Sequence, residues 1–99
     1  MKVFDNQEVL DELCRRHQIA RLSLFGSTIR GANRPDSDVD LLVEFKPDAR
    51  PSLFEMAEIE QELSRMLGGR PVDLRTAEDL SRHFRSEAVA SAQPQYESR

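Results

Sequence analysis

Apolar residues recur with two different periods along this sequence, and each period predicts a type of element. Leu10, Leu13 and Cys14 are spaced three to four residues apart, as on one face of a helix. Either Asn6 or Asp5 can cap the start of this helix with its side-chain oxygen. The first element of the chain is therefore predicted to be an amphipathic helix.

A second, longer helical pattern begins after a proline-containing linker at residues 46–51. Its apolar face consists of Met56, Ile59, Leu63, Met66 and Leu67. Ser52 and Glu55 have the spacing of a capping box at its start, and Gly68-Gly69 ends it. We expect this helix to be the longest in the chain and to pack across a sheet.

Three other segments have the patterns of strands. Residues 19–25 and 39–45 are mostly apolar, and residues 71–74 alternate between apolar and polar positions. The second of these segments contains three consecutive apolar residues, which favours a buried strand over an exposed edge. A last helix, capped by Thr76-x-x-Asp79, is predicted to run to residue 88.

The order of these elements predicts an α/β (α+β) fold in which helices flank a small mixed sheet of three to four strands. With 99 residues in all, the chain is expected to form one domain at residues 1–90. Residues 91–99 are polar and contain Pro94, so they are predicted to be a flexible tail. Tyr96 is accordingly interpreted as a tail residue rather than a site of self-modification.

Net charge, apolar runs and cysteine spacing argue against several classes of function. Fourteen basic and 18 acidic residues give a net charge of −4, so we expect no direct DNA binding. No apolar run reaches the length of a membrane span and the first residues lack a signal-peptide core, which predicts a cytoplasmic protein without a membrane partner. Cys14 has no zinc-like spacing to other ligands and is predicted to be a core residue, and His17 has no evident catalytic partner.

Two carboxylates mark the start of the second predicted strand. Asp38 and Asp40 project from one face of that strand, because side chains alternate, while Val39 points to the other face. Holding both carboxylates ionised in front of an apolar run is costly unless a cation binds between them. Oxygen ligands of this kind suit Mg²⁺, which is commonly bound by one or two carboxylates together with substrate phosphates.

The segment before these carboxylates has features of a phosphate site. Gly26 permits a sharp turn and a close approach of the backbone to a ligand. Ser27 can cap a short helical turn that includes Arg30, and the start of such a turn favours an anion. These features predict that the segment at Gly26 and Ser27 binds a nucleoside triphosphate whose Mg²⁺ is held by the following carboxylates.

A simpler interpretation of Asp38 and Asp40 is that they belong to a turn and then to a solvated strand face, which is common for Asp and Ser. The fixed spacing argues against it. Ten residues separate Ser27 from Asp38, and ordinary residue frequencies would produce such a pattern on the order of once in a thousand chains of this length.

Gly26-Ser27, ten residues and then Asp38-Val39-Asp40 resemble the signature of the DNA polymerase beta nucleotidyltransferase superfamily. The phrase GSTIRGANRPDSDVDLLVEF resembles the small members called minimal nucleotidyltransferases, or MNT proteins. The resemblance implies a nucleotidyltransferase fold and a third carboxylate on a neighbouring strand, and Asp73 lies where it is expected. It therefore implies that residues 1–90 are a minimal nucleotidyltransferase domain.

The resemblance also implies a mechanism. An acceptor hydroxyl attacks the α-phosphate of ATP, and pyrophosphate leaves. Asp38 and Asp40 would bridge two Mg²⁺ ions, and Asp73 would hold the catalytic ion and help to deprotonate the acceptor. Gly26 and Ser27 would hold the β- and γ-phosphates, with Arg30 as a further phosphate contact.

Many MNT proteins are antitoxins that transfer AMP to a tyrosine of a HEPN ribonuclease toxin. The resemblance thus implies a HEPN-type toxin as the protein partner. Two alternatives stay open: an antitoxin without catalytic activity that acts by binding alone, and a nucleotidyltransferase that acts on tRNA or a small hydroxylated molecule.

Overall fold

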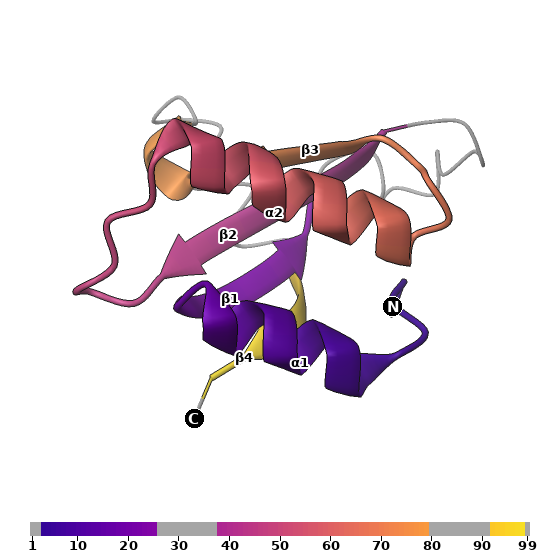
Figure 1. The fold of residues 1–99 in the computed structure, drawn as a ribbon, viewed down its shortest axis with the longest axis horizontal. Coiled ribbons are helices and arrows are strands. Elements are labelled where there is room, and N and C mark those ends of the chain that lie inside the picture. The colour runs from indigo at the N-terminus through magenta and orange to yellow at the C-terminus, as the bar shows by residue number, and fades with distance from the viewer. Residues whose placement is uncertain (1–2, 26–37, 80–91, 99) are drawn as a thin grey trace.

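Within the residues that the structure describes, the fold combines a four-stranded mixed sheet with two α-helices (Figure 1). The computed structural model describes residues 3–25, 38–79 and 92–98. Its elements are α1 (Gln7–Arg16), β1 (Ile19–Leu24), β2 (Val39–Phe45), α2 (Leu53–Met66), β3 (Val72–Arg75), the 3₁₀ turn η2 (Ala77–Asp79) and β4 (Gln93–Glu97). The strand order is β3-β2-β1-β4, with β2 parallel to β3 and β1 antiparallel to both of its neighbours. The predicted fold class and the predicted central position of residues 39–45 are confirmed.

Both helices cover the same face of the sheet (Figure 1). Leu41 and Leu74, which are opposite each other on β2 and β3, belong to one apolar core together with the buried residues of α1 and α2. The helices contribute Leu10, Leu13, Cys14, Ile59 and Leu63. Because alternate strand residues point to opposite faces, the residues between these core positions face away from the helices.

The helix ends follow the capping residues that were read from the sequence. Asn6 is the N-cap of α1 and its side chain accepts a hydrogen bond from the backbone of Val9. At the end of α2, Gly68 and Gly69 have φ values of 72° and 89°, in the left-handed region that favours glycine. The Gly69 N–H donates to the Ser64 carbonyl over 2.8 Å, as expected where a helix stops.

One of the two hydrogen bonds of the predicted capping box of α2 is present. The Ser52 hydroxyl accepts from the Glu55 backbone N–H at 3.1 Å. The Glu55 carboxylate turns instead toward His17, whose Nδ1 lies 3.0 Å away. The tertiary partner is therefore preferred to the local backbone donor.

Residues 93–97 differ from the predicted flexible tail, because they form β4 on the outer edge of β1. Tyr96 is 8% exposed and belongs to the apolar core, and Gln95 is buried as well. The Gln95 side chain also accepts a hydrogen bond from the Val3 backbone at 3.1 Å. Pairing satisfies the backbone groups that β1 would otherwise leave unpaired at an edge, which a polar sequence can do as well as an apolar one.

The start of the predicted last helix is present as η2. Thr76 donates to the Asp79 carboxylate from its backbone N–H at 3.1 Å and from its hydroxyl at 3.0 Å. The remainder of that predicted helix lies outside the described residues. Within the described residues, no helix is long and apolar enough to cross a membrane.

Candidate functional site

Asp38, Asp40 and Asp73 lie at the same end of the sheet, where the parallel strands β2 and β3 begin. Asp40 and Asp73 are direct partners in the register of these two strands. Asp38 is exposed and immediately precedes β2. Parallel strands that start together thus bring carboxylates 33 positions apart in the chain onto neighbouring backbones.

Asp40 and Asp73 project from the face of the sheet opposite α1 and α2. Leu41 and Leu74, which follow Asp40 and Asp73, are 0% and 5% exposed in the core between sheet and helices. Alternation therefore directs Asp40 and Asp73 to the opposite face, and both are partly exposed there. We call Asp38, Asp40 and Asp73 the carboxylate site.

The end of β1 also reaches this site. The Phe25 backbone N–H donates to the Asp40 carbonyl over 3.1 Å. Gly26 and Ser27 are the next residues of the chain. These two and Arg30, the predicted triphosphate contacts, lie outside the described residues.

The donor set suits a hard cation, since carboxylate oxygens are preferred by Mg²⁺. Among residues 3–25, 38–79 and 92–98, no group of three or more His, Cys, Asp or Glu side chains is arranged to hold a metal ion. One carboxylate has a different cation beside it, because the Arg75 Nε donates to the Asp73 Oδ2 at 3.1 Å. The backbone thus places the three carboxylates at one end of the sheet, and Arg75 engages one of them.

Sequence reasoning overlooked Glu60 as a support of this site. β3 is an outer strand among the described residues, so none of the described strands pairs with its Leu74 N–H on that side. The Glu60 carboxylate of α2 accepts from this N–H at 3.2 Å. The contact attaches α2 to the backbone between Asp73 and Arg75. An acidic helix residue beside an edge strand carries no signal in sequence spacing alone.

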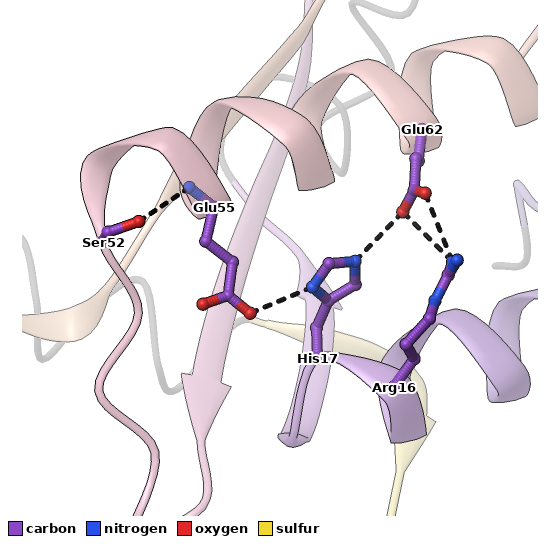
Figure 2. A network of polar contacts seen from close by, with 5 residues as sticks. All are labelled: Arg16, His17, Ser52, Glu55 and Glu62. Carbon is purple, nitrogen blue, oxygen red and sulfur yellow. Dashed lines mark hydrogen bonds and ion pairs between the residues drawn. The ribbon is translucent and has the colours of Figure 1, made fainter.

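A second polar cluster joins the two helices on the other side of the sheet (Figure 2). The buried His17 ring lies between two carboxylates of α2, with Nδ1 3.0 Å from Glu55 and Nε2 3.1 Å from Glu62. Arg16 donates to the same Glu62 at 3.2 Å. The cluster contains no carboxylate of the site, and its geometry explains how α2 is fixed relative to α1 and hence over β3.

Cys14 and Tyr96 are not suited to nucleophilic chemistry in the folded chain. Burial, and secondarily the nearby Asp11 carboxylate, raise the pKa of the Cys14 thiol to about 12, against a lowering effect of Arg15. Burial likewise raises the pKa of the Tyr96 phenol. The prediction that Cys14 is a core residue is confirmed.

Comparison with known proteins identifies the family. The model of the nucleotidyltransferase domain family, described as "Nucleotidyltransferase domain", matches residues 7–94. This chain belongs to that family. As a nucleotidyltransferase domain, it carries the carboxylate site on the elements that the match covers.

One relative of this chain is the protein adenylyltransferase MntA of Thermococcus cleftensis. It is 44% identical over 63 residues, which are 64% of this chain and 61% of that protein. The nucleotidyltransferase domain described here thus aligns with about three-fifths of the length of this relative.

Solved structures of nucleotidyltransferases share the fold. One assigned as a minimal nucleotidyltransferase is 36% identical, has a TM-score of 0.72 and is matched over 89% of this chain and 87% of its own. A toxin-antitoxin structure with AMP-PNP has a TM-score of 0.71 at 22% identity, with 95% of this chain and 75% of the other covered. An MNT antitoxin in complex with a tri-AMPylated HEPN toxin of Shewanella oneidensis has a TM-score of 0.63 at 19% identity, with 93% and 70% covered.

Proposed function

We propose that this chain is a Mg²⁺-dependent protein adenylyltransferase that acts as the antitoxin of a HEPN-type toxin. In this proposal it transfers AMP from ATP to a tyrosine hydroxyl of the toxin. The observation that carries the proposal is the register of β2 and β3, which pairs Asp40 with Asp73 next to Asp38 in a chain of the nucleotidyltransferase domain family. Three carboxylates at one end of a sheet repel one another, so their retention favours a bound cation over a purely structural role.

Each carboxylate has a role in the proposed reaction. Asp38 and Asp40 would hold two Mg²⁺ ions, and Asp73 would hold one of them and accept the proton of the acceptor hydroxyl. The acceptor oxygen forms a bond to the α-phosphorus, while the bond to the β-phosphate oxygen breaks and pyrophosphate leaves. Bound Mg²⁺ supplies charge neutralisation for the transferred group and the leaving pyrophosphate.

The triphosphate contacts assigned to Gly26, Ser27 and Arg30 belong to the same proposal. Gly26 allows the backbone to approach the phosphates, Ser27 donates to them, and Arg30 offsets their charge. The position of Phe25 supports this arrangement, because its N–H is bonded to the Asp40 carbonyl and Gly26 follows it directly. Triphosphate and carboxylates would then meet at one end of the sheet.

The proposed partner rests on relatives. MntA of Thermococcus cleftensis is designated a protein adenylyltransferase, and the Shewanella oneidensis complex pairs an MNT antitoxin with an AMPylated HEPN toxin. A structure of the same fold contains AMP-PNP, an ATP analogue, which supports ATP as the donor. The designation of the first relative and the AMPylated toxin of the second support a protein as the acceptor.

The test is transfer of label from α-labelled ATP, in the presence of Mg²⁺, to the protein encoded by the adjacent gene. We expect label on that protein, its loss with EDTA and its loss in the Asp38→Asn, Asp40→Asn variant. Asp48→Asn is a matched control, since Asp48 is an exposed carboxylate in the linker before α2. Label transfer by the Asp48→Asn variant should equal that of the unaltered chain.

Two outcomes would contradict the proposal. A stable complex without label from any of the four nucleotides would indicate an antitoxin that acts by binding alone. Label on tRNA or on a small hydroxylated compound, with none on the adjacent protein, would indicate a different acceptor. Mapping the labelled residue by mass spectrometry separates tyrosine from serine or threonine.

A further inference from the structure

Arg75 is placed to act on Asp73. The two residues are two positions apart on β3, so their side chains leave the same face of the strand. The Arg75 Nε lies 3.1 Å from the Asp73 Oδ2, and the two side chains are 47% and 38% exposed. Within the described part of the chain, this is the hydrogen bond that the Asp73 carboxylate makes.

The two oxygens of the Asp73 carboxylate have different surroundings. Arg75 engages Oδ2 and leaves Oδ1 without a hydrogen bond to the described residues. Asp40 is the neighbour of Asp73 across the strands, and two carboxylates in such positions repel each other. A guanidinium on one side of Asp73 offsets that repulsion and restricts the rotation of the carboxylate.

The same pair contributes little to folding. Ion pairs between exposed side chains typically stabilise a protein by about 0.2–1 kcal/mol. The backbone of β3 is already held by its pairing with β2 and by the Glu60 contact to Leu74. The orientation of the Asp73 carboxylate is therefore the property that depends on Arg75.

We propose that Arg75 is a positioning residue for Asp73, which it holds by Oδ2 so that Oδ1 is presented to the metal ion and the acceptor. This inference rests on the proposed function, because Asp73 matters for transfer only if the carboxylate site is catalytic. Groups that orient a metal ligand typically change metal affinity or activity by about 10–100-fold when they are removed.

Arg21 provides a matched control on the same face of the same sheet. It is 46% exposed and pairs with Glu44 and Glu97, each at 3.7 Å. It lies on β1, whereas Asp73 and Arg75 lie on β3, at the other side of β2. Arg21→Gln removes the same charge from the same face without touching the carboxylate site.

The first experiment compares AMP transfer by Arg75→Gln, Arg75→Lys and Arg21→Gln. We expect Arg75→Gln to lower kcat by about 10–100-fold and to change the KM for ATP much less, because the orientation of Asp73 affects the transfer step. Arg75→Lys keeps a cationic donor and should recover part of the loss. Arg21→Gln should retain the kcat of the unaltered chain. Equal kcat values for Arg75→Gln and the unaltered chain would overturn the proposal while leaving adenylyl transfer intact.

The second experiment does not depend on activity. Calorimetry measures Mn²⁺ binding, in the presence of AMP-PNP, to the unaltered chain, Arg75→Gln, Asp73→Asn and the double variant. If Arg75 acts through Asp73, Arg75→Gln should weaken Mn²⁺ binding by about 10-fold in the unaltered chain and should have no further effect in the Asp73→Asn background.

These two measurements separate the inference from the proposed function. Equal weakening of Mn²⁺ binding by Arg75→Gln in both backgrounds would mean that Arg75 acts independently of Asp73, and would overturn the inference. Loss of the effect in Asp73→Asn, in a chain that labels no partner protein, would support the positioning role and contradict protein adenylyl transfer. Failure of the unaltered chain to bind Mn²⁺ would overturn both.

Discussion

The two faces of the sheet use the same strands for different purposes. On the face covered by the helices, Leu41 and Leu74 are neighbours in the apolar core. One position earlier, Asp40 and Asp73 are neighbours on the opposite face and remain partly exposed. A single register between β2 and β3 therefore sets both the packing of the core and the placement of the carboxylates, so the two faces cannot be arranged independently.

The contrast is not simply between apolar and charged surfaces. The helix layer contains its own charged cluster, in which His17 lies between Glu55 and Glu62 (Figure 2). That cluster pairs Arg16 with Glu62 and hydrogen-bonds the His17 ring, whereas the carboxylate site places like charges at one end of the sheet, with Arg75 beside one of them. Paired charges can hold elements together, and gathered like charges are suited to bind a cation.

The largest expected effect is on activity, from a substitution on the face opposite α1 and α2. Asp40→Asn should lower AMP transfer by about 10²–10³-fold, the loss typical for removal of one electrostatic contact to a reacting group. The same variant should lower the free energy of unfolding much less than a core substitution does, because Asp40 is partly exposed and lies outside the apolar core. Transfer of labelled AMP and urea unfolding followed by circular dichroism measure the two effects. Reduced stability with full activity would contradict the division between faces.

The opposite pattern, a loss of stability with little loss of activity, is expected for Leu41, the residue after Asp40. Leu41→Ala removes a fully buried side chain from the core and should lower the free energy of unfolding by about 2–5 kcal/mol. The fraction that stays folded at low temperature should transfer AMP at close to the normal rate. Urea unfolding and transfer assays at 10 °C provide the comparison. A loss of activity in fully folded Leu41→Ala protein would mean that core packing also controls the carboxylates.

A smaller effect is expected in the helix layer. The glutamine in His17→Gln cannot bridge Glu55 and Glu62 as the imidazole does. The variant should lower the free energy of unfolding by about 1–2 kcal/mol, because the hydrogen bonds of the buried imidazole to these two carboxylates are lost. Arg16→Gln is the matched control. Arg16 pairs with the same Glu62, but its side chain is 57% exposed. Arg16→Gln should therefore lower the free energy of unfolding by an amount near the bottom of the range typical of exposed ion pairs, about 0.2–1 kcal/mol. Thermal unfolding of both variants measures the difference, and equal losses would show that His17 adds nothing beyond a surface ion pair.

Much of the fold was predictable because its signals are local. The helix starting after Asn6, the strand at residues 39–45 and the glycine stop after α2 each depend on residues within one or two helical turns or strand repeats. β4 was missed, since the polar run QPQYE has no apolar alternation and gains its structure from pairing with β1, more than 60 positions away in the chain. Tyr96 packs into the core only because that pairing exists.

The residues of the candidate site were likewise predictable from the sequence only in part. Asp38 and Asp40 could be selected from their spacing after Gly26-Ser27, and Asp73 from the resemblance to a family. Glu60 could not, because its partner is a backbone N–H on an edge strand of another element. The cluster around His17 joins residues 38 and 45 positions apart in the chain, which no local pattern indicates.

The sequence by itself determined α1, α2, the central strands, most of their core positions and the acidic motif, since periodic burial and side-chain chemistry are encoded within short segments. Only the tertiary structure decided that β2 and β3 are parallel and in a register that pairs Asp40 with Asp73. It also decided that β4 closes the sheet and that Arg75 engages one oxygen of Asp73. Strand order, register and the choice between competing partners depend on the packing of distant segments, and that packing is settled only when the whole core forms.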